Sequence, residues 1–133
     1  MKSNKIPAYT LNELLIVLVI IGILVLLALP VLMPLISRTK STEAKLQLKH
    51  IYTLQRTEFM MKSKYSMDFA TIGFEHEKTI DQGGNANYQI EIIEASPNSF
   101  KARATALADF DGDGIINVWE IDENQNLIEV TPD

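Results

Sequence analysis

The acidic stretch from Asp109 to Glu120 has the residue types and the spacing of a calcium-binding loop. Asp109, Asp111 and Asp113 stand at positions 1, 3 and 5, a glycine follows at position 6, and Glu120 stands at position 12. This order matches the pattern D-x-[DN]-x-[DN]-G-x5-E letter for letter. Carboxylate oxygens at these positions are the ligands that a twelve-residue calcium loop supplies. The stretch is therefore the first candidate for a metal site.

The segments around the acidic stretch favour a turn over a complete EF-hand. An EF-hand needs a helix on each side, but residues 100–108 and 115–122 both read as strands. In the first of these segments, apolar and polar side chains alternate with a period of two from Phe100 to Ala106. If residues 115–120 are a strand, a rise of ~3.3 Å per residue carries Glu120 about 16 Å beyond Ile115. Glu120 is then the weaker candidate ligand, and we expect Asp109, Asp111 and Asp113 to gather in a turn.

Two interpretations of that turn stay open at this point. In the first, calcium neutralises three carboxylates that lie within five residues of one another. In the second, the segment is an Asp-Gly turn that holds no ion.

Glu13 is the second chemically unusual residue, because it stands at the leading edge of an apolar run. Residues 14–36 carry no charge, and about 20 apolar residues in a helix cross a hydrocarbon layer of ~30 Å. A cleaved secretory signal has an apolar region of only ~7–15 residues. We therefore expect a single-pass membrane helix, and Lys2 and Lys5 before it favour a cytoplasmic N-terminus.

One long helix is predicted from residue 11 to residue 61, with a membrane half and an amphipathic half. Beyond the apolar run, apolar residues recur with a period near 3.6, and Gln55 fills the gap in their stripe. The members of this stripe are Ala44, Leu48, Ile51 and Phe59. Pro30 and Pro34 each lack a backbone N–H and predict a kink.

The rest of the chain predicts a small antiparallel sheet. Residues 63–86 read as a loop, and strand patterns follow at 87–94, 100–108, 115–122 and 126–131. A sheet of three or four strands needs a cover for its apolar face, which only the amphipathic part of the helix offers. The fold class is therefore α+β, with one long helix packed on a three- or four-stranded antiparallel sheet.

The segment KIPAYTLNELLIVLVIIGILVLLALP (residues 5–30) resembles the N-terminal signal of the type IV pilins and of the pseudopilins of type II secretion systems. That family has a short basic leader, a small residue at a cleavage point, an aromatic first mature residue, a TL pair, a glutamate fifth and a proline twenty-second. In this chain the corresponding residues are Ala8, Tyr9, Thr10, Leu11, Glu13 and Pro30. Ala8 replaces the usual glycine.

The resemblance implies a sequence of processing steps and a domain plan. A prepilin peptidase removes the leader, residues 1–8, on the cytoplasmic side and methylates the new amine of Tyr9. Residues 9–36 form the membrane and assembly helix of a single-pass protein in the bacterial inner membrane. Residues 37–133 form a globular domain that becomes part of a periplasmic or extracellular filament, built by a dedicated assembly machinery.

The resemblance also gives Glu13 a partner that its own chain lacks. In a filament the carboxylate faces the amino terminus of a neighbouring subunit and fixes the register of the two helices. Physics alone offers a local alternative, a capping box in which Thr10 caps the helix and Glu13 reaches back, and the two roles are compatible. In assembled pili of this family, the helix is partly melted between the positions of Gly22 and Pro30.

We therefore expect a structural filament subunit and not an enzyme. The first alternative is a type II secretion pseudopilin; the segment KYSMDFATIGFE (residues 64–75) favours a pilin over it. The second is a monomeric, membrane-anchored calcium-binding module. Secretion pseudopilins hold calcium in a C-terminal loop, so calcium is the one cofactor considered. A net charge of −5 argues against a nucleic-acid partner, and the sequence has no cysteine.

Overall fold

The computed structural model describes residues 8–133. The expected leader lies outside the described residues except for Ala8. The chain divides into two compact units between Met33 and Pro34. Helix α1 (Leu11–Lys62) runs through both units without a break, which confirms the predicted long helix. The predicted kink at Pro30 and Pro34 and the expected domain boundary after residue 36 stay predictions.

The described part of the first unit is helical from Leu11 onward, and its apolar side chains are exposed. The most apolar window of 18 residues in α1 has a mean hydropathy of 3.4, and its residues are exposed. By length and composition, α1 is the one helix in residues 8–133 that is suited to cross a membrane. An all-round apolar surface of this kind is stable only in lipid or against other chains.

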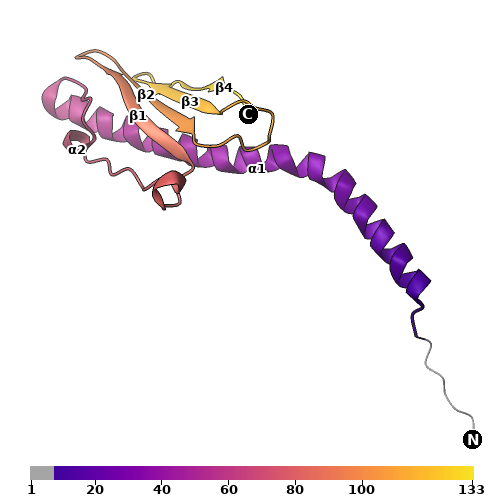
Figure 1. Ribbon diagram of the computed structural model, residues 1–133. Coiled ribbons are helices and arrows are strands. Elements are labelled where there is room, and N and C mark those ends of the chain that lie inside the picture. The colour runs from indigo at the N-terminus through magenta and orange to yellow at the C-terminus, as the bar shows by residue number, and fades with distance from the viewer. Residues whose placement is uncertain (1–7) are drawn as a thin grey trace, which may run out of the picture. The chain divides into compact units, whose positions relative to one another are not determined.

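The second unit is a four-stranded antiparallel sheet packed on its own part of α1 (Figure 1). The strands are β1 (Tyr88–Ala95), β2 (Phe100–Ala106), β3 (Val118–Asp122) and β4 (Leu127–Thr131). Their order in the sheet is the order in the chain, so the sheet is an antiparallel meander. The predicted α+β class is confirmed.

The core lies between the sheet and α1, where the two predicted periodicities meet. Ala44, Leu48 and Ile51 are fully buried on the helix, and every second residue of β2 is buried against them. Gln55 is also fully buried, at the gap in the apolar stripe. Its amide donates to the Ser66 carbonyl at 2.6 Å and accepts from the Ser66 N–H at 3.0 Å, so its polar atoms are satisfied.

Strand β3 begins three residues later than the sequence predicts, so the expected strand 115–122 is wrong at its start. The N–H of Ile115 donates to the carboxylate of Asp113 at 2.7 Å, which continues the acidic turn. Ile115 and Ile116 are exposed. The side chain of Asn117 belongs to a buried hydrogen-bonded network. Polar contacts therefore shape the backbone at the end of the turn, and pairing with β2 starts at the Asn117 carbonyl, which accepts from the Ala106 N–H at 2.9 Å.

The predicted loop between α1 and β1 contains two short helices, α2 (Phe69–Ile72) and η1 (Ile80–Gln82). Gly83 ends η1 with φ of 82°, a left-handed conformation that glycine adopts without strain. The next residue, Gly84, packs closely against the backbone of Lys78. A Cβ at position 84 would lie 1.9 Å from the carbonyl oxygen of Lys78. The turn after η1 thus depends on glycine at both positions.

Candidate assembly and metal sites

The capping box predicted at the start of α1 is present in the structure. The N–H of Thr10 donates to Oε2 of Glu13 at 3.1 Å, and the N–H of Glu13 donates to Oγ1 of Thr10 at 3.3 Å. Both groups are exposed. Ala8 and Tyr9 precede the helix in exposed, irregular backbone, and Gly22 and Pro30 lie within α1. In the single chain, therefore, the carboxylate of Glu13 has a local partner and residues 22–30 are helical.

The acidic turn after β2 is held by its own backbone N–H groups. Asp109 accepts from the N–H of Gly112 at 2.7 Å and from the N–H of Gly114 at 2.5 Å. Asp111 accepts from the N–H of Asp113 at 3.0 Å. Gly112 and Gly114 have φ of 83° and 87°, so the turn bends at glycines in the left-handed region. Each carboxylate still has lone pairs available for a cation.

A fourth carboxylate, Asp133, joins the three that the sequence predicts. One oxygen from each of Asp109, Asp111, Asp113 and Asp133 lies within 4.8 Å of the others. Asp133 accepts a hydrogen bond from Oγ of Ser37 at 2.8 Å through Oδ2, while its Oδ1 is buried and has no hydrogen-bond partner within residues 8–133. The pairing of Val118 with Thr131 brings the segment after β4 beside the turn. Sequence reasoning could have placed Asp133 in the cluster only with the correct register of β3 and β4.

The carboxylates of Asp109 and Asp111 differ in proton affinity. The N–H groups of Gly114 and Gly112 lower the pKa of Asp109, although partial desolvation opposes them. For Asp111, the Asp113 N–H lowers the pKa, but desolvation, the charge of Asp113 and the contact with Asp109 outweigh it and raise the pKa. Such crowding is relieved by a cation. A set made only of carboxylate oxygens suits a hard divalent ion such as calcium.

Glu120, the weaker candidate ligand, lies away from this cluster. Its Oε1 accepts from Nε of Arg103 at 2.9 Å and from Nη2 at 2.6 Å. The two residues are cross-strand neighbours on β2 and β3. The D-x-D-x-D-G part of the motif therefore gathers in space, and the glutamate that completes the string does not join it.

Asn117 is a buried residue beside the acidic turn. The calcium-loop motif specifies no residue type at this position. Its Oδ1 accepts from the Tyr88 hydroxyl at 2.7 Å and from Nε1 of Trp119 at 2.8 Å. Its Nδ2 donates to Glu129 at 2.8 Å and to the Thr131 carbonyl at 2.9 Å. Asn117 thus fastens the end of the turn to β1 and β4. Trp119 belongs to the core between sheet and helix.

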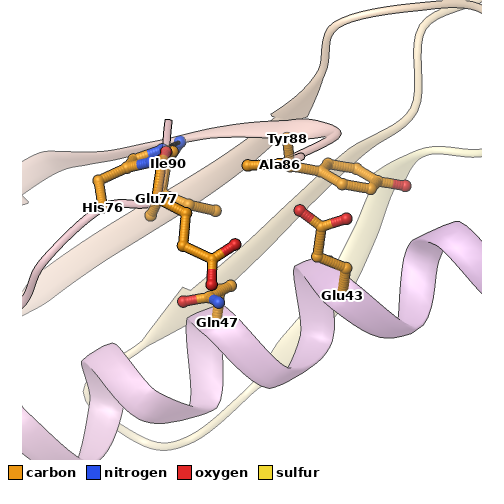
Figure 2. A pocket seen from close by; sticks show the side chains of 7 residues that line it. All are labelled: Glu43, Gln47, His76, Glu77, Ala86, Tyr88 and Ile90. Atoms are coloured by element: carbon orange, nitrogen blue, oxygen red, sulfur yellow. Dashed lines mark hydrogen bonds between the residues drawn. The ribbon is translucent and has the colours of Figure 1, made fainter. Parts of the chain in front are cut away.

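His76 lies in the predicted loop and is half-buried against the edge of β1. Its Nε2 accepts from the backbone N–H of Ile90 at 2.8 Å. Figure 2 shows the small cavity beside it, with Glu43 and Gln47 pointing from α1 toward the segment 86–90 and Glu77 facing them. The cavity has a volume of about 10 Å³, which is enough for about one water molecule. Glu43 holds Asn87 through the Asn87 N–H and Nδ2, both at 2.9 Å, so this contact positions the start of β1.

Comparison with known proteins gives one informative relative. No family model matches the chain. Over 71 residues, 53% of the chain, the sequence is 48% identical to the "Type IV major pilin protein PilA" of Myxococcus xanthus (strain DK1622). The match covers 32% of that protein, so the chain spans about a third of the length of its relative. This similarity confirms the resemblance of the chain to the type IV pilins.

Proposed function

We propose that the protein is a structural subunit of a type IV pilus-like filament, polymerised through α1. The observation that carries the proposal is the identity of 48% to a major pilin. The exposed apolar surface of the first unit supports it, because such a surface needs lipid before assembly and neighbouring helices afterwards. The subunit rests in the bacterial inner membrane as a single-pass protein until it is added to the filament. We propose no catalytic role.

Processing by a prepilin peptidase is the first step of the proposed pathway. The peptidase cleaves between Ala8 and Tyr9 and methylates the amine of Tyr9. Exposed backbone before the first turn of α1 supports this cut, because a protease needs an extended segment that is free of helical hydrogen bonds. Mass spectrometry of the mature chain tests the step: an N-methylated Tyr9 is expected, and an intact Met1 in assembled material would contradict it.

Glu13 then changes partner on assembly. In the single chain its carboxylate accepts from the Thr10 N–H, and in the filament it pairs with the amine of a neighbouring Tyr9. An unpaired charge between apolar helices costs several kcal/mol, so a subunit displaced by one turn is rejected. Local melting of residues 22–30, which are helical in the single chain, accompanies packing into the filament.

The decisive variant is Glu13→Ala. It keeps the membrane run and the cleavage point, so insertion and processing should be normal. We expect the filament yield to fall about tenfold or more, since tenfold corresponds to ~1.4 kcal/mol and an unpaired charge costs more than that. The measurement is the amount of sheared filament per cell.

Asn12→Ala is the matched control, because it removes a neighbouring polar side chain from the same turn and should leave assembly unchanged. Normal filaments from Glu13→Ala would contradict the register role. If surface filaments are absent even from the unaltered protein while a secretion machine needs it, the subunit is a pseudopilin. An unprocessed, monomeric chain would favour the membrane-anchored calcium module.

We further propose that the acidic cluster holds calcium. The gathered oxygens of four carboxylates and the unpartnered, buried Oδ1 of Asp133 support this assignment. Asp109, Asp111, Asp113 and Asp133 would be the ligands. Because Asp133 also accepts from Ser37 on α1, the ion would fasten the turn, the segment after β4 and the helix at one point.

A further inference from the structure

A groove runs between α1 and the β3–β4 side of the sheet, separate from the small cavity beside His76. Its volume is about 380 Å³. Its wall on the helix is formed by Ser37, Arg38, Ser41 and Lys45, and its opposite wall includes Glu129 and Asp133. The groove therefore has cationic groups on one wall and carboxylates on the other.

These opposite charges do not pair with each other. Within residues 8–133, the ion pairs join Lys62 to Glu58 and Arg103 to Glu120, and neither Arg38 nor Lys45 takes part in one. The ammonium group of Lys45 lies 4.6 Å from the centre of the Trp119 ring. The described part of the chain thus presents both signs of charge side by side in one groove.

The carboxylates of the groove keep free acceptor positions. Glu129 accepts through Oε1 from Asn117 at 2.8 Å, and Asp133 accepts through Oδ2 from Ser37 at 2.8 Å. Among the residues that the structure describes, none donates a hydrogen bond to the second oxygen of Asp133. A primary ammonium group carries three N–H donors and fits such a wall, whereas a guanidinium and an ammonium on the other wall suit a phosphate.

The basic wall of the groove begins directly after the apolar run along the chain. Ser37 and Arg38 directly follow the apolar run that ends at residue 36. At most ~3.6 Å per residue, they lie within about 7 Å of its end, whatever the course of the helix. The headgroup layer is ~5–7 Å thick on each side of the hydrocarbon core. If the run spans the bilayer, the basic wall begins within that layer.

We propose that this groove binds a zwitterionic phosphoethanolamine headgroup of a membrane lipid while the subunit resides in the bilayer. The phosphate lies against Arg38 and Lys45, and the primary ammonium lies against Glu129 and, when no calcium is bound, against Asp133. A choline headgroup carries no N–H donor for the carboxylates, and a glycerol headgroup carries no cation. The groove therefore selects phosphatidylethanolamine over both. This inference rests on the membrane anchoring in the proposed function and is independent of filament assembly.

The test uses the full chain in nanodiscs that contain equal amounts of phosphatidylethanolamine, phosphatidylcholine and phosphatidylglycerol with the same acyl chains. A chelator keeps calcium away from Asp133. After mild delipidation, mass spectrometry counts the lipids that stay with the protein. We expect about fivefold more phosphatidylethanolamine than either other lipid, as charge-assisted hydrogen bonds to one headgroup imply.

Arg38→Gln and Glu129→Gln should each abolish the enrichment, and both are mild changes. Arg38 is exposed, and a glutamine at position 129 still offers an oxygen to Asn117. Arg56→Gln is the matched control, because Arg56 is an exposed cation on α1 away from the groove and should leave the enrichment intact.

Equal retention of the three lipids overturns the proposal, and so does a preference for phosphatidylglycerol, which would indicate simple attraction to anionic lipid. Enrichment that survives both variants places the headgroup elsewhere and also overturns it. If the chain fails to enter the nanodiscs, the anchoring itself is wrong, and this result is distinct from entry without lipid selection.

Discussion

Tyr88 carries a buried hydroxyl whose pKa depends on charged residues of α1, of β4 and of the segment after β4. Its side chain is 1% exposed, and its hydroxyl donates to Asn117 at 2.7 Å. Burial raises its pKa above the ordinary value of about 10, and the negative charges of Asp133, Glu43 and Glu129 raise it further. A tyrosinate at this position has no compensating cation among these neighbours. The folded state therefore keeps the proton more tightly than the unfolded chain.

The expected consequence is a loss of stability at alkaline pH. The folded-state pKa is raised, so the contribution of Tyr88 is fully present below pH ~10 and is lost as the pH rises toward the folded-state value. The slope from this one group is at most ~1.4 kcal/mol per pH unit. Denaturant unfolding of the full chain in detergent between pH 8 and pH 11 measures it.

Tyr88→Phe should flatten that alkaline slope. It should also cost about 1 kcal/mol at neutral pH, because the hydrogen bond to Asn117 is lost. Tyr52→Phe is the control, since Tyr52 lies on α1 and its hydroxyl has no part in the network around Asn117. Equal alkaline slopes for the unaltered protein and Tyr88→Phe would show that other groups govern the effect.

At the scale of elements, the turn before β1 depends on a close approach of backbone to backbone. A Cβ on residue 84 would lie 1.9 Å from the Lys78 carbonyl oxygen. The same oxygen accepts a hydrogen bond from the Ala86 N–H at 3.1 Å. Gly84→Ala should therefore open the segment 78–86 and destabilise the protein by about 1–3 kcal/mol. Amide hydrogen exchange should show lost protection at Ala86 and in β1.

Gly22→Ala is an informative comparison, because nothing lies within 4 Å of a Cβ at that position in the described structure. It should leave exchange in β1 unchanged. Full protection of Ala86 in Gly84→Ala would mean that the turn moves aside at little cost.

The elements that sequence patterns predict well are those whose signal is local. The 3.6-residue spacing of Ala44, Leu48 and Ile51 depends only on the helix itself, and all three are buried as predicted. The start of β3 is misjudged because the apolar Ile115 and Ile116 read as strand, while side chains from the acidic turn and Asn117 decide the backbone there. A period of two records alternation and carries no information on such polar competition.

The same distinction applies to the candidate sites. Thr10 and Glu13 are three residues apart, so their capping box is visible in the sequence. Asp133 reaches the acidic cluster only through the pairing of β3 with β4, and His76 meets Ile90 across 14 residues of chain. Contacts of this kind depend on strand register and loop closure, which residue spacing alone does not specify.

At the scale of the whole molecule, the acidic cluster lies where distant parts of the second unit meet. Asp109, Asp111 and Asp113 come from the turn after β2, and Asp133 follows β4. The hydrogen bond from Ser37 adds the beginning of the helix portion in this unit. An ion at this point would oppose unfolding of the turn, the sheet edge and the helix together, which makes global stability the most direct measure of binding.

We expect calcium to raise the Tm of the full chain in detergent, because a ligand that binds only the folded state stabilises it by mass action. At a calcium concentration 100 times the Kd the gain is ~2.7 kcal/mol, and each kcal/mol raises the Tm by roughly 4–8 °C in a unit of this size. Asp133→Asn and Asp109→Asn should each reduce the response, and magnesium should produce a smaller one, since it gives up its water ligands reluctantly. Glu75→Gln is the control, an exposed carboxylate outside the cluster. An unchanged Tm at millimolar calcium would leave the segment as an Asp-Gly turn, whereas an undiminished response in Asp133→Asn would restrict the site to the turn and remove its link to α1.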